Sequence, residues 1–178
     1  QNVSEYEEGA YTGEISVRSL LETNVKFCIV GHSERRQIFQ EKDKDINLKS
    51  KRLIANNVIP IICIGETLEQ KEKGITNKVL EEQLMYSIPG SSTFENTIIA
   101  YEPVWAIGTG LTPTNKEIDE THRFIRNHND KFIKYNILYG GSVKASNAKE
   151  ITDLANVDGV LIGGASLKSE EFTKIIQD

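Results

Sequence analysis

The sequence from residue 100 to residue 110 is Ala100-Tyr101-Glu102-Pro103-Val104-Trp105-Ala106-Ile107-Gly108-Thr109-Gly110. Glu102 ends an apolar run that starts at Thr97, which is typical of a buried strand with a carboxylate at its carboxyl end. Burial raises the pKa of such a carboxylate and suits it to act as a general base. The residues after Glu102 are apolar, rich in glycine and bracketed by Pro103 and Pro113, which favours a lid over a structural crossover with Trp105 in the core.

Four other runs rich in Ile, Val and Leu have the same character, at residues 26–31, 59–65, 136–140 and 159–163. They do not alternate strictly, as expected of strands buried on both faces. Amphipathic segments with helical spacing lie between them, in rows formed by Leu80, Leu84 and Ile88 and by Ile118, His122 and Ile125. Capping-box patterns begin at Thr67 and Thr114. The sequence therefore predicts one α/β domain over residues 1–178 with parallel strands.

The number of strands fits two architectures. Five runs, with a possible stub of a sixth strand at residues 1–3, are compatible with an open doubly wound sheet and with part of an eight-stranded barrel. The periodicity does not choose between them.

The composition is that of an ordinary globular protein, with 38% hydrophobic and 26% charged residues. A net charge of -5 gives no general attraction to nucleic acid or to an anionic membrane, and the apolar runs are too short to cross a bilayer. Cys28 and Cys63 lie inside apolar runs and are expected to be buried free thiols, which suits the reducing cytoplasm. The chain opens with polar residues and has no initiator Met, so we expect no signal peptide and a natural start upstream of Gln1.

Polar residues follow the strand predicted at residues 26–31, in the cluster Gly31-His32-Ser33-Glu34-Arg35-Arg36. Active groups of parallel α/β folds lie at the carboxyl ends of strands, which favours a functional role for His32. For Glu34, Arg35 and Arg36, a structural ion pair fits equally well.

Two further strand ends carry paired glycines, in Tyr139-Gly140-Gly141-Ser142-Val143 and Ile162-Gly163-Gly164-Ala165-Ser166. Glycines let backbone N–H groups approach an anion, and two such turns on successive strands are typical of a barrel phosphate site. No group of His, Cys and Asp has the spacing of metal ligands, and no Walker motif or dinucleotide fingerprint occurs. His122 and His128 are predicted to lie on an exposed helix and to be solvated.

Taken in order, these motifs resemble the triosephosphate isomerase family over residues 1–178. The resemblance rests on five further segments besides the Glu102 stretch: Ala10 to Ser16, Val30 to Arg36, Cys63 to Glu66, Tyr139 to Val143 and Leu161 to Ala165. It implies a (β/α)8 TIM barrel, represented by about six of its eight βα units. It also implies the interconversion of dihydroxyacetone phosphate and D-glyceraldehyde 3-phosphate in glycolysis and gluconeogenesis, with neither metal nor organic cofactor.

The resemblance assigns roles as well. The family is itself a standard example in which a Glu is the base and a neutral His the electrophile; by match these are Glu102 and His32. It implies that Ser33 and Glu34 organise the site, and that backbone groups of Gly108, Ser142, Gly163 and Gly164 hold the phosphate. It further implies a cytoplasmic homodimer, with Tyr11 and Thr12 in the contact surface.

Leu111 and Pro113 depart from the family, whose members often carry Lys and Ala there; we interpret this as tolerated hinge variation. The chain also lacks roughly two N-terminal βα units, which carry a substrate-binding Asn and Lys in the family. From this we expect that a polypeptide of these residues alone cannot close its barrel and has negligible activity. A non-catalytic remnant is therefore one alternative. Another is a different phosphate-binding barrel enzyme such as a phosphoribosyl isomerase, which explains the glycine turns but not Glu102 and the segment after it.

Overall fold

The computed structural model describes residues 1–107, 109 and 111–177. In these residues a single parallel sheet contains the strands β1 (Phe27–Val30), β2 (Ile59–Ile64), β3 (Ile98–Tyr101), β4 (Asn136–Tyr139) and β5 (Gly159–Val160). Each strand pairs with the next one along the chain, in the order β1-β2-β3-β4-β5. A doubly wound sheet reverses its order at a switch point, whereas a barrel does not. The strand order therefore decides for a barrel arc.

The core lies where the isoleucines of neighbouring strands align. Ile62 of β2 pairs in register with Ile99 of β3, which pairs with Ile137 of β4. All three side chains are buried. Burial on both faces of the sheet explains why these strands read as continuous apolar runs. Cys28 and Cys63 are buried free thiols, as expected.

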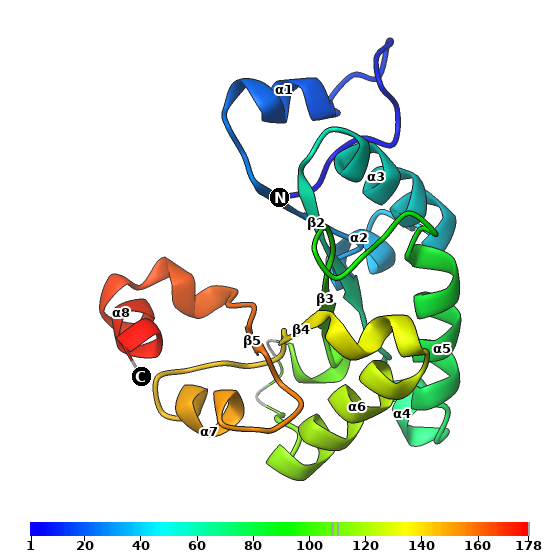
Figure 1. The fold of residues 1–178 in the computed structure, drawn as a ribbon. Coiled ribbons are helices and arrows are strands. Elements are labelled where there is room, and N and C mark those ends of the chain that lie inside the picture. The colour runs from blue at the N-terminus through cyan, green and yellow to red at the C-terminus, as the bar shows by residue number, and fades with distance from the viewer. Residues whose placement is uncertain (108, 110, 178) are drawn as a thin grey trace.

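The helices alternate with the strands. They are α1 (Val17–Glu22), α2 (Ser33–Gln37), α3 (Asp43–Ala55), α4 (Leu68–Glu72), α5 (Thr76–Ser87), α6 (Asn115–Asn127), α7 (Ala148–Thr152) and α8 (Ser169–Gln177), with 3-10 turns η1 (Val104–Ala106), η2 (Asp130–Lys134) and η3 (Gly164–Leu167). Figure 1 shows α3, α5 and α6 side by side along one face of the sheet. The capping boxes at Thr67 and Thr114 are both present. No helix in the described part of the chain is long and apolar enough to cross a membrane.

Both ends of the sheet differ from the sequence-based expectation. The backbone at residues 1–3, all of them described, forms no strand: Asn2 has a φ of 54°, which interrupts the extended conformation, although its N–H donates to the Ile29 carbonyl at 2.8 Å. Strand β5 ends at Val160, three residues before Gly163. Among the described residues β5 pairs with β4 alone, so only one neighbour supports it.

His122 is not solvated, and that prediction was wrong. Its side chain is 0% exposed, between Ile118 and Ile125 on the buried face of α6. The ring lies edge-on to Tyr101, with centroids 5.8 Å apart. Burial lowers the pKa of His122 to about 4. The helical spacing of His122 with Ile118 and Ile125 indicated its buried position correctly, whereas its polarity did not. His128, at the end of α6, is partly exposed.

This burial predicts an acid-dependent loss of stability. The pKa of His122 is lower in the folded chain, about 4, than the ordinary 6.5, so below pH 6.5 the unfolded chain binds more protons. The free energy of unfolding should therefore decrease as the pH falls from 6.5 to 4, with His122 contributing about 3 kcal/mol of that decrease. Urea unfolding at several pH values measures it.

The His122→Phe variant should lose this part of the pH dependence, because it keeps a ring but no titrating group. His128→Phe controls for the removal of an imidazole from the same helix. Equal pH slopes in the native protein and His122→Phe would contradict the prediction.

Candidate active site

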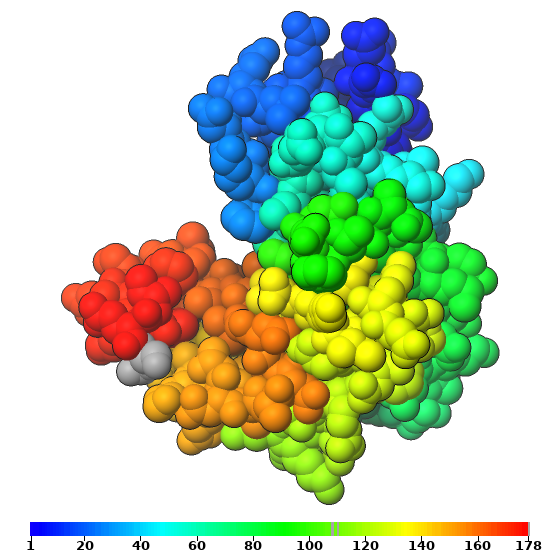
Figure 2. Space-filling model, in the orientation of Figure 1, coloured from blue at the N-terminus to red at the C-terminus, as the bar shows by residue number. Residues whose placement is uncertain are grey.

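A cavity of about 800 Å³ opens at the carboxyl ends of the strands. It collects most of the residues that the sequence singled out: His32, Glu34, Glu102, Ser142, Gly163 and Gly164. It extends from Gln1 and Asn2 to Lys168 and Glu171, and Figure 2 shows a hollow between the N-terminal part (blue) and the C-terminal part (red). Gly108, a predicted phosphate contact, lies outside the described residues.

Glu102 follows β3 and points its carboxylate toward the end of β1. Its Oε1 lies 3.2 Å from His32 Nε2, and its Oε2 accepts the Ser33 N–H at 3.0 Å. The residue is only 2% exposed. Burial raises the pKa of Glu102, while His32 and the Ser33 N–H act in the opposite direction. A carboxylate in this environment is a stronger base than one in water.

His32 is the N-cap residue of α2, which fixes the ring. Its Nδ1 accepts the Glu34 N–H at 3.2 Å. In the neutral ring the proton therefore lies on Nε2, which faces Glu102 and the cavity. The backbone thus sets the tautomer of the ring. The Glu34 side chain is largely exposed and stays 3.9 Å from Nδ1.

Two glycines, Gly65 and Gly140, make room for Glu102. A Cβ at Gly65 would lie 1.7 Å from the Glu102 carbonyl oxygen, and a Cβ at Gly140 would lie 2.9 Å from Glu102 Cγ. Both glycines end strands that flank β3. Their position at strand ends is the only sequence signal; the contact itself joins segments far apart in the chain.

The segment from Pro103 to Pro113 is anchored on its N-terminal side by Glu66. The indole N–H of Trp105 donates to Glu66 Oε1 at 2.8 Å, and the Tyr101 hydroxyl lies 3.2 Å from both carboxylate oxygens. Glu66 is buried, which raises its pKa, while the bond from Trp105 lowers it. Glu66 ends the motif Cys63 to Glu66, and no pattern in the sequence indicates this anchoring role.

The glycine turns contribute differently to the cavity. Ser142 Oγ donates to the Ala106 carbonyl at 2.7 Å, which links the turn after β4 to the segment after Glu102. Gly163 and Gly164 have open space where a side chain would stand. Their backbone is therefore accessible from the cavity, as an anion site requires.

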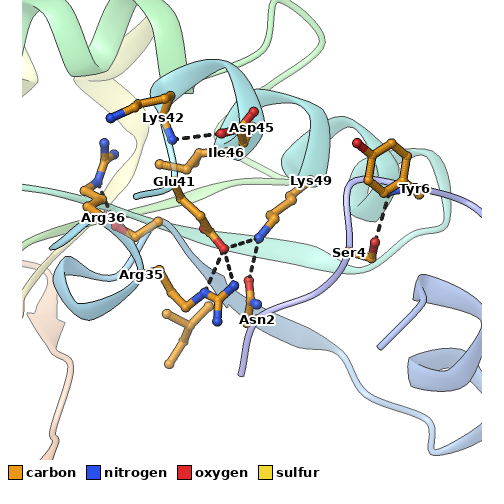
Figure 3. A network of polar contacts seen from close by, with 12 residues as sticks. Asn2, Ser4, Tyr6, Arg35, Arg36, Glu41, Lys42, Asp45, Ile46 and Lys49 are labelled. Carbon is orange, nitrogen blue, oxygen red and sulfur yellow. Dashed lines mark hydrogen bonds and ion pairs between the residues drawn. The ribbon is translucent and has the colours of Figure 1, made fainter. Parts of the chain in front are cut away.

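The two arginines after Glu34 have structural partners. Arg36 donates to the Gly31 carbonyl at 2.8 Å and pairs with Asp43 at 2.6 Å. Arg35 pairs with Glu41 at 2.6 Å (Figure 3).

Figure 3 also shows a second cation, Lys49, paired with the same Glu41 oxygen. The two atoms are 2.5 Å apart. The Lys49 ammonium donates to Asn2 Oδ1 at 3.0 Å as well. Arg35 and Arg36 each form an ion pair, but their acidic partners are Glu41 and Asp43 rather than Glu34.

Two further predictions concern metals and the loop before α1. Across the described ranges, no cluster of three or more His, Cys, Asp or Glu side chains is arranged to hold a metal ion. Tyr11 and Thr12 lie exposed on a loop remote from the cavity lining. The Tyr11 ring stacks on Tyr6 with centroids 3.9 Å apart.

Comparisons with known proteins agree over almost the whole chain. The sequence model of the triosephosphate isomerase family matches residues 1–178. Triosephosphate isomerase of Mesomycoplasma hyorhinis is 48% identical over 176 residues, covering 99% of this chain and 71% of that protein. The Francisella tularensis subsp. mediasiatica protein of the same name is 47% identical over 183 residues, covering 99% and 72%.

The crystal structure of triosephosphate isomerase from Bartonella henselae has a TM-score of 0.91 at 41% identity and covers 99% of this chain and 73% of that one. Fold, sequence and cavity agree, and the chain belongs to the triosephosphate isomerase family.

Proposed function

We propose that the intact protein interconverts dihydroxyacetone phosphate and D-glyceraldehyde 3-phosphate through an enediolate, without a metal or organic cofactor. The observation that carries this proposal is the approach of the Glu102 carboxylate to His32 Nε2, 3.2 Å, at the mouth of a cavity with two glycine turns. The isomerisation moves one hydrogen between neighbouring carbons and converts the adjacent carbonyl and hydroxyl into each other. It needs a base and a donor side by side.

Glu102 serves as the base. Its carboxylate removes a proton from the carbon next to the carbonyl and returns it to the neighbouring carbon, so the residue is unchanged after a turnover. Burial raises the pKa of Glu102, which favours proton abstraction. The Ser33 N–H holds Oε2 at 3.0 Å and leaves Oε1 as the reacting oxygen.

His32 serves as the electrophile. Its Nε2–H donates to the oxygen on which negative charge develops and stabilises the enediolate. The ring gives this proton to the former carbonyl oxygen and takes up the hydroxyl proton from the neighbouring oxygen, so it too is unchanged after a turnover. The Glu34 N–H occupies Nδ1, at 3.2 Å, so in the neutral ring Nε2 is the atom that carries the hydrogen and can donate it.

The glycine turns hold the phosphate group. We assign Ser142, Gly163 and Gly164 to this contact, together with Gly108, because three of the four line the cavity that also contains Glu102. The apolar segment after Glu102 closes over the phosphate and excludes water, which limits loss of phosphate from the enediolate.

A coupled assay with each triose phosphate tests the reaction. His32→Gln should lower kcat by about 100- to 1000-fold, the usual effect of removing one oxyanion donor. His128→Gln, the same change on a partly exposed histidine, should leave kcat unaltered.

Two other outcomes of the assay would favour the alternative functions. Turnover of another sugar phosphate alone would favour a different barrel isomerase. Phosphate binding without turnover would favour a non-catalytic remnant.

The loop at residues 5–14 supports a homodimer, which we also propose, with Tyr11 and Thr12 in the contact. The Ser4 N–H and the Ile15 carbonyl close its base at 2.8 Å, and Figure 1 shows the loop extending away from the sheet. Exposed apolar residues, Ile38 and Phe39, follow α2. Exposed aromatic and aliphatic side chains of this kind are typical of an interface.

Sedimentation velocity measures the dimer. Thr12→Arg should shift the protein to monomer at micromolar concentration, because it places a long cation in the contact. Glu72→Arg, on the distant helix α4, should leave the dimer intact. A dimer that persists in Thr12→Arg would exclude this loop as the contact.

A place in glycolysis and gluconeogenesis, in the cytoplasm, is part of the same proposal, because these pathways interconvert the two triose phosphates.

A further inference from the structure

Lys71, in the last turn of α4, contacts one residue near the start of the segment from Pro103 to Pro113 and one residue just after its end. Its Nζ lies 3.6 Å from the centroid of the Trp105 ring on the N-terminal flank. The same Nζ pairs with Glu117 Oε1 at 2.9 Å, in the first turn of α6, just beyond the C-terminal flank. One ammonium group therefore connects Trp105, near the start of the segment, with Glu117, just after its end, although the two residues are twelve positions apart in the chain.

Both sites are themselves held in place. Trp105 donates to the buried Glu66, at 2.8 Å. The second oxygen of Glu117 accepts the Thr114 N–H at 2.8 Å and the Thr114 hydroxyl at 2.9 Å. These bonds from Thr114, and then Lys71, lower the pKa of Glu117 to about 2, so the carboxylate is charged at neutral pH. An exposed ion pair alone contributes little, but here one cation serves an aromatic face and an anchored carboxylate at once.

The surroundings leave room for the flanks to move. A second cavity, of about 560 Å³, lies beside them and is lined by Glu66, Lys71, Trp105, Pro113 and Glu117. Trp105 is 9% exposed, and the Lys71 ammonium lies over its ring beside this cavity, where it can limit displacement of the ring toward the open space. The effect reaches the active site through the next residue, because the Ala106 carbonyl accepts Ser142 Oγ at 2.7 Å.

We propose that Lys71 is a positioning residue that couples the two flanks of the segment and so sets how it closes over the phosphate. The proposal rests on the function proposed above and adds a role for a side chain that touches neither the substrate nor the reacting atoms.

Fluorescence tests the coupling without any need for turnover. Trp105 is the only tryptophan in the sequence, so its emission reports on this flank alone. Lys71→Met keeps the aliphatic stem and removes the charge, and acrylamide should quench Trp105 about two- to fivefold more effectively in this variant than in the native protein. Lys71→Arg should restore the native value, because a guanidinium also stacks on an indole and pairs with a carboxylate.

Lys73→Met is the matched control. Lys73 lies on the same helix end, and its recorded partner is the exposed Glu69, at 2.5 Å. Its removal should leave the quenching of Trp105 unchanged. Equal quenching in the native protein and Lys71→Met, or an equal increase in Lys73→Met, would overturn the proposal.

A second measurement connects the flank to the reaction. Inorganic phosphate should reduce the quenching of Trp105 in the native protein as the segment closes, and Lys71→Met should need more phosphate for the same reduction. In the coupled assay, kcat should fall about two- to fivefold with KM almost unchanged, and more inorganic phosphate should be released per turnover. If Lys71→Met lowers the thermal stability enough to account for its loss of kcat, the role of Lys71 is merely structural and the proposal is overturned.

The two proposals fail in different ways. If phosphate does not change the quenching of Trp105 in the native protein, the proposed closure of the segment is contradicted. That part of the proposed function is then contradicted as well. The quenching comparison without phosphate still decides whether Lys71 holds the flank.

Discussion

Replacement of Glu102 by Gln should lower kcat by about 100- to 10,000-fold, the range by which a positioned general base accelerates proton transfer. Gln has the same shape, and its amide oxygen can still accept the Ser33 N–H that Glu102 Oε2 accepts at 3.0 Å. The fold and the cavity should therefore persist while the basic group is lost. The coupled assay gives kcat, and urea unfolding checks that the variant is folded.

Two companion variants sharpen this experiment. Glu102→Asp keeps a carboxylate but withdraws it by one methylene, and a displacement of about 1 Å should cost roughly 100-fold. Glu81→Gln makes the same chemical change on the exposed side of α5 and should have no effect. An active Glu102→Gln, within tenfold of the native protein, would mean that the base lies elsewhere.

The dependence of kcat/KM on pH should also reflect the Glu102 carboxylate. Because burial raises the pKa of Glu102, kcat/KM should begin to fall at a higher pH than for an ordinary glutamate as the solution is acidified. The loss follows protonation of the carboxylate, which then cannot accept the substrate proton. An acid limb that coincides with the pKa of an ordinary glutamate would argue against a buried base.

Replacement of Gly65 by Ala should have the largest effect on stability. The added Cβ would lie 1.7 Å from the carbonyl oxygen of Glu102, which is backbone and cannot rotate away. One of two paired strands, β2 or β3, must then move, at a cost of about 3 kcal/mol or more. The Glu102 carboxylate should move with its strand, so activity should fall even in the folded fraction.

Urea unfolding measures this cost, and Gly90→Ala is the matched control. A Cβ at Gly90 would meet nothing within 4 Å. A Gly65→Ala variant as stable as Gly90→Ala would show that β2 and β3 are not held as close as the structure has them.

The positions of β1 to β4, the capping boxes and the order of the motifs could be predicted from the sequence, because they depend on neighbours within a few residues. The two ends of the sheet could not, since residues 1–3 form no strand and β5 ends at Val160. An apolar run flanked by glycine and polar residues indicates a buried strand wherever it lies. A Thr three residues before a Glu or Gln is enough to indicate a helix start, as at Thr67 and Thr114. The same local reasoning placed Glu102 and His32 at strand ends.

The local patterns could not choose between two folds or place every side chain. A doubly wound sheet and a barrel use the same βα units, and the order of pairing in space separates them. His122 shows the limit within one helix: its polarity suggested solvent, whereas packing against Tyr101 buries it. Burial depends on what covers a helix face, and that cover comes from distant segments.

The sequence by itself singled out the residues that we propose carry the chemistry, since Glu102, His32 and the paired glycines each follow an apolar run directly. Only the tertiary structure decided how they meet. The approach of Gly65 to Glu102 spans 37 residues, and the pair between Lys71 and Glu117 spans 46. Such contacts form only when parallel strands align in register and bring their carboxyl ends to one edge, because no pattern within a single segment encodes the distance to another.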